Sequence, residues 1–400
     1  MDKEVIYMDN NATTMVAPEV FEEMKPFLTD LYGNPSSMHT FGGQVGRKIA
    51  EARSKVMELI GAQYDTEIIF TSCGTESNST AIFSALQAYP DRKEIITTRV
   101  EHPAILSLAP YLERQGIAVV QLKVDSKGRL DMDEYARFLN EGTAIVSVMT
   151  ANNETGVIFP VEEMARMAHD KGVLFHTDAV QAAGKIEINM ENSLIDMLSI
   201  SGHKLHAPKG VGALYVRRGT KFRPFLRGGH QEKNRRAGTE NVASIIAMGK
   251  AVELARVHIE EENSRVKEMR DRLEKGIIEN IPRAIINGDT ENRLPNTTNI
   301  SFEFIEGEGI LLLMNDFNIA ASSGSACTSG SLEPSHVLRA MGVPFTAAHG
   351  SIRFSLSRYN TMDEVDLVIE KMPPIIEKLR AISPFWNNGN PVAGFEPEYK

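Results

Sequence analysis

Short apolar runs alternate along the first half of the chain with stretches whose apolar residues recur at helical spacing. From about residue 45 to 220, this alternation predicts strands separated by helices, of which 77–89 and 160–171 are the clearest. The predicted strands are 67–71, 94–98, 144–149, 173–176, 197–200 and 212–216. Because strands that alternate with helices form βαβ units, we expect an α/β fold with a mainly parallel sheet covered on both sides.

The pattern changes in the second half of the chain. A long helical segment rich in Glu, Arg and Lys, 244–280, indicates a connection between two domains. Beyond it, short predicted strands at 298–304 and 351–355 mix with helices, which fits a smaller α+β domain. We therefore predict a large domain at 15–258, a small domain at 1–14 and 259–385, with 1–14 irregular ahead of the first helix, and an extended C-terminal tail at 386–400.

Composition and charge exclude several classes of protein. A net charge of -10 leaves no basic footprint for nucleic acid. Two cysteines cannot form a disulfide framework, and the charged N-terminus lacks the apolar core of a signal peptide. No apolar run approaches the ~18 residues of a membrane span. We therefore expect a soluble cytoplasmic protein with no nucleic-acid or membrane partner.

Polar residues follow the predicted strands where each strand ends. In parallel sheets, ligands bind beyond these carboxyl ends. The residues in question are the turn at Gly74 and Thr75, His102 before a proline, the amide cluster around Asn153, Asp178, and Lys204. Each has a structural alternative: a helix cap for the turn and for Asp178, an ordinary loop for His102 and Asn153, and a surface position for Lys204.

Taken together, these residues match the needs of one cofactor. Pyridoxal phosphate requires an amine for its aldehyde, a carboxylate for its pyridinium nitrogen, and a phosphate cup. Lys204, Asp178 and the turn at Gly74 supply these parts, and His102 supplies a ring to stack on the cofactor. A dehydrogenase would need GxGxxG after the first strand, and the sequence lacks it. His203 and His206 have the spacing of a metal pair, but no carboxylate or cysteine lies beside them.

Cys327 is the second chemical feature of the chain. It lies in a stretch of small residues, ASSGSACTSGS at 321–331, with no side chains able to pack a core around a buried thiol. We interpret it as a nucleophile on an open loop. Cys73, at the turn before Gly74, is interpreted as structural, with a redox or reactive role as the alternative.

The motifs of the chain, in their order, resemble those of the cysteine desulfurases, which belong to the pyridoxal-phosphate fold type I superfamily (class V). The matching motifs are YMDNNATT at 7–14, GNPSS at 33–37, TSCGTE at 71–76, EHP at 101–103, NNETG at 152–156, HTDAVQ at 176–181, SGHK at 201–204, RAGT at 236–239 and SGSAC at 323–327. Within the family, the Cys327 loop, LEPSHVL at 332–338 and the C-terminal region resemble the NifS/IscS group, and NifS most of all. The resemblance implies a large domain with a mainly parallel seven-stranded sheet.

The resemblance also implies a role for each matching residue. Lys204 would hold the cofactor and move the substrate Cα proton, while Asp178 would pair with the pyridinium nitrogen. Gln181 would bind the ring hydroxyl, and His102 would stack on the ring and assist proton transfer. Cys327 would attack the sulfur of L-cysteine, which leaves L-alanine and a Cys327 persulfide.

The remaining contacts implied by the family concern the phosphate and the substrate. The phosphate would be held by Gly74, Thr75, Ser201 and His203, and by Thr239 of a second subunit, which implies a homodimer. Asn153 would contact the cofactor and, with Arg353, fix the substrate carboxylate. Any metal contact at Cys327 would be transient, through its persulfide, at a [2Fe-2S] cluster shared with a scaffold protein.

Several alternatives stay open at this point. The implied sulfur acceptor is a NifU-like or IscU-like iron–sulfur scaffold, and the physiological role is nitrogenase maturation or a housekeeping IscS-type supply. Another fold type I activity, such as that of a selenocysteine lyase, is a further alternative. Such an activity does not require a thiol on a mobile loop, so Cys327 distinguishes it from a cysteine desulfurase. A non-catalytic sulfur carrier would not need Lys204, Asp178 and His102 together.

Overall fold

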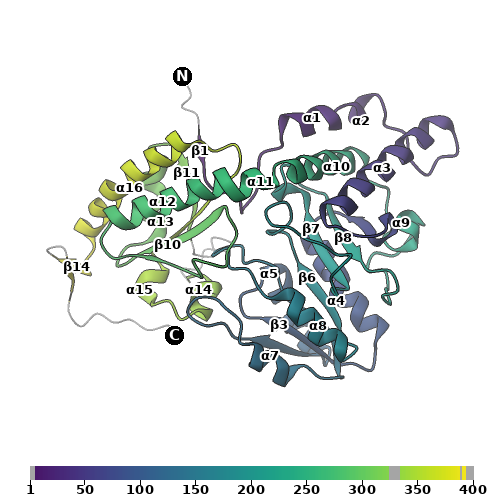
Figure 1. Ribbon diagram of the computed structural model, residues 1–400, viewed down its shortest axis with the longest axis horizontal. Helices are drawn as coiled ribbons and strands as arrows, with labels where there is room; N and C mark the ends of the chain where they lie inside the picture. The colour runs from purple at the N-terminus through teal and green to yellow at the C-terminus, as the bar shows by residue number, and fades with distance from the viewer. Residues whose placement is uncertain (1–4, 324–333, 388–389, 393–400) are drawn as a thin grey trace.

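The computed structural model describes residues 5–323, 334–387 and 390–392. Its larger sheet has seven strands in the order β2-β8-β7-β6-β5-β3-β4 (Figure 1). Their bounds are β2 Ile68–Thr71, β3 Glu94–Thr98, β4 Ala118–Leu122, β5 Thr143–Ser147, β6 Leu174–Asp178, β7 Met197–Ser201 and β8 Gly212–Val216. All neighbours pair in parallel except β8, which is antiparallel to both β2 and β7. The predicted α/β class and the mainly parallel seven-stranded sheet are confirmed.

Both faces of this sheet are buried, and successive strand residues show it. Ile68 and Ile96 belong to one apolar cluster, whereas their neighbours Ile69 and Ile95 belong to another on the opposite face. The first cluster includes α3 (Thr40–Leu59), α8 (Val161–Asp170) and α10 (Val242–Val257); the second includes α4 (Gly74–Ala88), α5 (Pro103–Leu106) and α6 (Ala109–Arg114). Layers of helices on both sides leave the strand ends as the place for a ligand.

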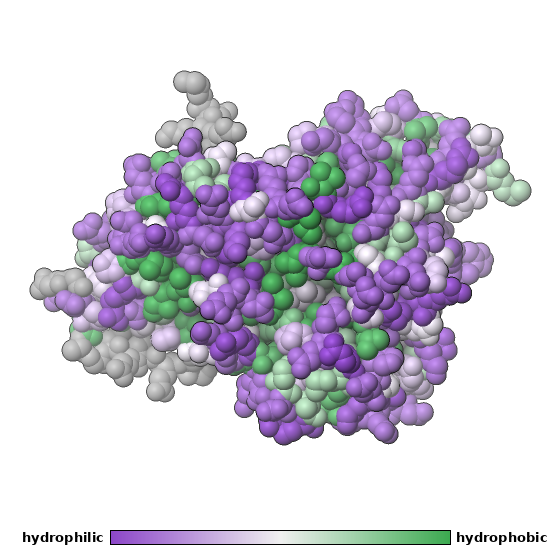
Figure 2. Space-filling model, in the orientation of Figure 1, coloured by the Kyte–Doolittle hydropathy of each residue, from purple (hydrophilic) through white to green (hydrophobic). Residues whose placement is uncertain are grey.

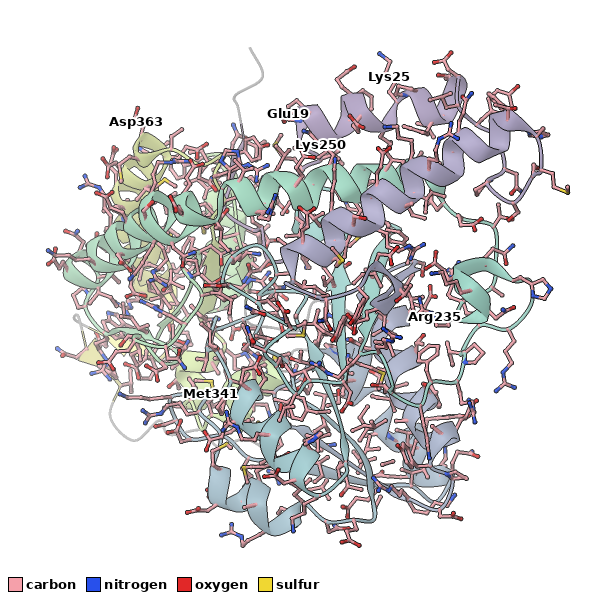
Figure 3. All side chains as sticks on the ribbon, turned by 45° about the vertical axis from the view of Figure 1, so that its right-hand side comes forward. Glu19, Lys25, Arg235, Lys250, Met341 and Asp363 are labelled. Carbon is pink, nitrogen blue, oxygen red and sulfur yellow. The ribbon has the colours of Figure 1, made fainter. Side chains whose placement is uncertain are left out.

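Helix α1 (Pro18–Met24) and the four-residue α2 (Pro26–Thr29) form an outer layer over α10. Figure 3 labels Glu19 on α1 and Lys250 on α10 in this region, and Lys25 between α1 and α2. Further along the chain lie α7 (Met132–Phe138) and the short α9 (Gln231–Asn234), next to which Figure 3 labels Arg235. These helices enlarge the layer but contribute no residue predicted for the site.

Three segments differ from the sequence prediction. Strand β4 was missed, because it lies at the sheet edge and its residues are mostly exposed or half-buried rather than a buried apolar run. Helix α4 begins at Gly74, three residues before the predicted start, because its first turn is polar. The predicted 244–280 helix is divided into α10, the short α11 (Ile259–Glu261), a π-helical turn at Glu262–Val266 and α12 (Lys267–Asn280).

A second apolar core lies around a four-stranded antiparallel sheet of order β12-β13-β10-β9. Its strands are β12 Ser322–Ser323, β13 Ser351–Ser355, β10 Thr297–Phe302 and β9 Ala284–Ile286. Helices α12, α13 (Gly307–Asn315) and α16 (Met362–Ile382) pack on it, and Figure 3 labels Asp363 in the first turn of α16. The short helices α14 (His336–Ala340) and α15 (Phe345–Ala348) instead pack with the first core; Met341, just past α14, is labelled in Figure 3.

The two ends of the chain are more regular than predicted. Strand β1 (Ile6–Tyr7) pairs in parallel with β11 (Ile319–Ala320), and Met8 is fully buried in the second core, so the start of the described chain is packed although 10–14 contain no helix or strand. Strands β14 (Trp386–Asn387) and β15 (Asn390–Pro391) pair antiparallel within the described part of the predicted tail. Hydrophilic residues cover much of the face in Figure 2. Within the described residues, no helix combines the length and apolar character needed to cross a membrane.

Candidate active site

A cavity of about 330 Å³ lies at the carboxyl ends of β5, β6 and β7. Its walls contain ten of the residues predicted for the site: Gly74, Thr75, His102, Asn153, Asp178, Gln181, Ser201, His203, Lys204 and Arg353. Nine of them come from strand ends and turns of the larger sheet, and Arg353 comes from β13 of the second sheet. Its volume lies at the lower end of the roughly 300–1,000 Å³ of ligand cavities.

Lys204 ends a 3₁₀ turn, Gly202–Lys204, that follows β7 directly. Its amine donates hydrogen bonds to the carbonyl oxygens of Ala12, at 2.6 Å, and Asn11. Burial, together with the positive charges of Arg353 and Lys185, lowers the pKa of Lys204 to about 7. A lysine amine with such a pKa is partly neutral near neutral pH and is able to act as a nucleophile or a base.

Asp178 is the last residue of β6, and its side chain enters the same cavity. One carboxylate oxygen accepts a hydrogen bond from the amide of Asn78 at 2.6 Å, and the other accepts one from the backbone N–H of Val180 at 3.0 Å. Asn78 is fully buried on α4, so it holds the carboxylate from the helix side. A buried carboxylate fixed in this way is suited to a cationic N–H donor, such as a protonated ring nitrogen.

The turn at Gly74 starts α4, a helix of 15 residues. Backbone N–H groups at such a helix start attract an anion. A Cβ atom at Gly74 would lie 2.9 Å from the Val180 side chain, so glycine is required for close packing here. Glu76 accepts a hydrogen bond from the backbone N–H of Ser72 at 2.7 Å and forms an ion pair with Arg236 at 2.8 Å, which fixes the turn.

His102 lies at the rim of the cavity, where part of its ring reaches solvent. Its Nδ1 accepts a hydrogen bond from the backbone N–H of Ala104 at 3.1 Å, so His102 also caps α5. The surrounding protein lowers the pKa of His102 by burial, opposed by the charge of Asp178. The neutral ring therefore carries its proton on Nε2. His102 therefore caps α5 and also lines the cavity.

Arg353 joins the two sheets at the floor of the site. Its guanidinium donates to the carbonyl oxygen of Asn153 at 3.1 Å and to the carboxylate of Asp9 at 2.7 Å. The same oxygen of Asp9 accepts a hydrogen bond from the Ser322 hydroxyl at 2.9 Å. A guanidinium has five N–H donors, so these contacts leave others available for a ligand carboxylate.

Three buried polar atoms test whether this cavity fits pyridoxal phosphate. Gln181 Oε1, Ser201 Oγ and Asn78 Oδ1 have no hydrogen-bond partner within the described part of the chain, and Gln181, Ser201 and Asn78 all line the cavity. Buried polar atoms are normally paired. A ring hydroxyl would donate to Gln181 Oε1 and a phosphate would accept from Ser201 Oγ, while a protonated ring nitrogen would donate to the carboxylate of Asp178. The residues therefore fit the cofactor.

One predicted site residue that the structure describes does not line the cavity. Thr239 is exposed and lines a separate hollow of about 150 Å³ beside Ser72 and Arg236. Cys327 lies outside the described residues. Ser322, five residues earlier, bonds to Asp9, and His336, nine residues later, bonds to the carbonyl oxygen of Glu101 at 2.9 Å. The described residues on either side of this segment thus contact Asp9, which pairs with Arg353, and Glu101, which precedes His102.

Cys73 also lines the cavity, half-buried at the N-cap of α4, with the Ser72 hydroxyl 3.6 Å from its sulfur.

No cluster of three or more His, Cys, Asp or Glu side chains with metal-binding geometry occurs among the residues that the structure describes. The His203 ring instead contacts the Thr13 hydroxyl at 3.2 Å, and its pKa falls to about 4 through burial and the nearby charge of Lys204.

Sequence reasoning missed several residues of the site. Asn78, Asp9 and the backbone of Asn11 hold Asp178, Arg353 and Lys204, respectively. Glu101 was also missed: it is fully buried, it accepts hydrogen bonds from Thr98 and Met149, and burial raises its pKa to about 8. Polar residues on the buried face of a helix, such as Asn78, are the signal that would have identified one of them.

Comparisons with known proteins agree with this geometry. The model of the class-V aminotransferase family matches residues 6–368. The cysteine desulfurase NifS of Azotobacter vinelandii is 61% identical over 98% of this chain and 99% of its own length. A solved structure described as a NifS-like protein superimposes with a TM-score of 0.88 at 39% identity, covering 94% of this chain and all of the other. A further one, described as SspA in complex with cysteine, has a TM-score of 0.79 at 33% identity, with coverages of 89% and 100%.

These matches define a class-V aminotransferase, a fold type I enzyme whose cofactor is pyridoxal phosphate. At this identity over nearly its whole length, the chain belongs to the cysteine desulfurases within that family. The resemblance seen in the sequence motifs is confirmed.

Proposed function

We propose that this chain moves the sulfur of L-cysteine onto its own Cys327, releases L-alanine, and supplies that sulfur for iron–sulfur cluster assembly. The observation that carries the proposal is the Lys204 amine, with a pKa of about 7, in one cavity with Asp178, His102 and Arg353. This set offers a base, a carboxylate for a ring nitrogen, a second proton carrier and an anchor for a substrate carboxylate.

The residues of the chain would divide the work as follows. Lys204, Asp178, Gln181 and the turn at Gly74 would hold pyridoxal phosphate. The chemistry that this cofactor supplies when bound is an electron sink for negative charge at the substrate Cα. Arg353 and Asn153 would hold the substrate carboxylate and so fix which Cα bond faces Lys204.

Proton movement would be shared by Lys204 and His102. The neutral Lys204 amine would remove the Cα proton, since its lowered pKa keeps part of it unprotonated near pH 7. His102, with its proton on Nε2, would serve as the second proton carrier at the rim. Ser201, His203 and Thr75 would hold the phosphate, with Thr239 of a second subunit.

Sulfur transfer would occur at Cys327. Its thiolate would attack the substrate sulfur: an S–S bond forms, the Cβ–S bond breaks, and the electron pair left on Cβ takes a proton to give the methyl group of alanine. The sulfur is oxidised to a persulfide as the carbon is reduced, so no outside oxidant is needed. Cys327 lies four residues after Ser323, a reach of at most roughly 14 Å.

We further propose a homodimer in a reducing compartment such as the cytoplasm, where Cys327 stays a free thiol. The acceptor would be a NifU-like scaffold that serves nitrogenase maturation, because the relative with 61% identity is a NifS. Any metal contact at Cys327 would be the transient one to a [2Fe-2S] cluster on that scaffold. Transfer of sulfur to a NifU-like scaffold, compared with an IscU-like one, would measure this choice; a preference for the IscU-like scaffold would favour the housekeeping role.

The test of the activity is Cys327→Ala, assayed with L-cysteine and a reductant. The variant is expected to keep its bound cofactor and its absorbance response to L-cysteine, while sulfide release falls to background. Cys73→Ser is the matched control, because it removes the other thiol, and it should retain sulfide release. Full sulfide release by Cys327→Ala would contradict the assignment.

A further inference from the structure

Lys204 lines a second, much smaller cavity of about 20 Å³. Its wall is formed by the turn at Gly184 and Lys185, the turn at 204–206, the end of α10, the π-helical turn that begins at Glu262, the N-terminal segment at Asn10 and Thr14, and the residues after β13 up to Arg358. The charged and titratable side chains in its wall are Lys185, Lys204, His206, His258, Glu262 and Arg358. The proposed reaction uses only Lys204 among them.

Glu262 presents a buried acceptor in this cavity wall. Its side-chain oxygen Oε2 has no hydrogen-bond partner within the described part of the chain, and only 7% of the residue is exposed. Burial raises the pKa of Glu262, whereas the charges of Lys185 and Arg358 oppose that rise. Glu262 begins a π-helical turn, a local widening of helices that is frequent at functional sites.

Lys185 is a buried lysine in the same cavity wall as Glu262. It is 7% exposed, and its backbone is fixed on both sides: its carbonyl oxygen accepts from Asn263 at 2.8 Å, and its N–H donates to Ala182 at 3.0 Å. Burial lowers the pKa of the Lys185 amine, and Glu262 opposes the shift. A lysine and a glutamate buried together are each stabilised in the charged form by the other.

The size and lining of the cavity fit one water molecule. A buried water needs roughly 10–15 Å³ and two to four polar partners. The volume here exceeds that limit, and the wall offers an ammonium donor and an orphaned carboxylate oxygen. Lys185 and Glu262 form no direct ion pair within 4.0 Å among the described residues, and both line the space that a water would fill.

We propose that one ordered water in this cavity bridges the Lys185 ammonium and the Glu262 carboxylate, and that Lys185, kept charged in this way, is a positioning residue that favours the neutral form of the Lys204 amine. The inference rests on the proposed role of Lys204 as the reacting amine. It assigns a function to a lysine that touches neither substrate nor cofactor.

The effect is a balance of charges around Lys204. Arg353 and Lys185 lower its pKa, whereas Asp9 and Asp178 raise it. His206, in the same wall, is neutral, since burial lowers its pKa to about 3. His258 is turned to Glu261, with a contact of 2.9 Å. Arg358 supports the negative charge of Glu262. Lys185 is thus the cation of this wall whose charge acts on Lys204 from behind the active site.

The test measures the protonation of Lys204 directly. Reductive methylation modifies only neutral amines, so its rate at Lys204, mapped by mass spectrometry on the full chain freed of cofactor, follows the pKa of this residue. In Lys185→Met, the pH midpoint is expected to rise by roughly one unit, the size of effect that one charge has over several Å. A high-resolution crystal structure should show the water between Lys185 and Glu262.

Two further variants keep the test decisive. Lys185→Met alone leaves Glu262 without a counter-charge and so risks misfolding. Lys185→Met with Glu262→Gln removes both charges; its midpoint should still rise, by less than in the single variant, because the negative charge of Glu262 is lost as well. Lys171→Met, which removes an exposed lysine at the end of α8, should leave the midpoint unchanged. An unshifted midpoint in the double variant, or a crystal structure with no water there, overturns the proposal. The labelling reports on Lys204 without turnover, so this failure is distinct from a failure of the proposed function.

Discussion

Lys204 shows how one side chain acquires its chemistry from its surroundings. A free lysine is protonated at neutral pH, but burial and two neighbouring cations bring the pKa of Lys204 to about 7. The amine donates hydrogen bonds to the carbonyl oxygens of Asn11 and Ala12, which hold it in place. Position in the sequence predicted the residue, but only the three-dimensional arrangement gives its pKa.

This pKa predicts a pH dependence of proton removal. The neutral amine is the base, and its fraction grows as pH rises through about 7, so the rate should rise with pH in that region and level off above it. Exchange of the substrate Cα proton for deuterium, measured in Cys327→Ala, isolates this step from the ionisation of the Cys327 thiol. A rate that does not change between pH 6 and 8 would contradict the assignment of Lys204 as base.

Asn78 offers a second prediction for a single residue. Its amide donates to Asp178 at 2.6 Å inside a fully buried pair. Asn78→Ala should weaken cofactor binding about tenfold, because Asp178 loses a charge-assisted hydrogen bond worth roughly 1.5 kcal/mol. Equilibrium dialysis of pyridoxal phosphate would measure it. Ser54→Ala, which removes an exposed hydroxyl on α3, is the control and should leave the affinity unchanged.

Single residues also show which parts of the site the sequence could predict. Asp178 and Lys204 were found because parallel strands place their carboxyl ends together. The ion pair of Asp9 with Arg353 joins residues 344 positions apart, and no local pattern encodes such a contact. Asn78 sits on a helix face that the sequence presents as ordinary core. Partners fixed only by tertiary contact were therefore the ones missed.

At the scale of elements, strand β2 is tied to the segment that leads to Thr239. Glu232 is 3% exposed in its side chain, forms an ion pair with Arg53 at 2.6 Å and accepts a hydrogen bond from the N–H of Phe70, within β2, at 3.0 Å. These contacts fix the position of the chain just before Thr239.

Removing this tie should destabilise the protein. Glu232→Ala leaves the Arg53 side chain, which is 14% exposed, without its ion-pair partner, and the backbone N–H of Phe70 without an acceptor. The free energy of unfolding should therefore fall by roughly 2–4 kcal/mol. Urea unfolding would measure the change. Glu51→Ala breaks the exposed pair with Lys48 and should cost less than about 0.5 kcal/mol. If both variants lost the same free energy of unfolding, the buried pair would contribute no more to stability than the exposed pair.

The boundaries of the elements followed the strength of their apolar signals. Strands β3 and β8 and strand β13 have the predicted bounds, since each is a buried run. Edge strand β4 and the polar first turn of α4 carry weak signals and were missed or shortened. The π-helical turn at Glu262–Val266 keeps a helical pattern of residues, so no local signal predicts an interruption there.

At the scale of the whole molecule, residues from the seven-stranded and the four-stranded sheet line one site. We propose the domain division at 15–258, with 1–14 and 259–385 as the small domain, supported by an apolar core around each sheet. Arg353 from one sheet and Lys204 from the other line the same cavity. Substrate binding therefore depends on how the two parts pack.

The proposed homodimer makes a prediction about mixed subunits. If Thr239 completes the site of the partner, a dimer of one Lys204→Ala and one Thr239→Ala subunit contains one site with both residues intact. Inactive Lys204→Ala protein, mixed and refolded with Thr239→Ala, should then restore normal cofactor affinity to one of the two sites in each mixed dimer. Calorimetric titration with pyridoxal phosphate would measure it. If affinity stays at the level of Thr239→Ala, the residue does not act across subunits.

The most direct test of the account is the fate of the substrate sulfur in a single turnover. The holoenzyme is mixed with less than one equivalent of L-cysteine, quenched with an alkylating agent and analysed by peptide mass spectrometry. The account predicts one added sulfur atom on the peptide that contains Cys327, in an amount equal to the alanine formed, and none on the peptide that contains Cys73. Alanine formed without added sulfur on Cys327, or sulfur found on Cys73 instead, would contradict it.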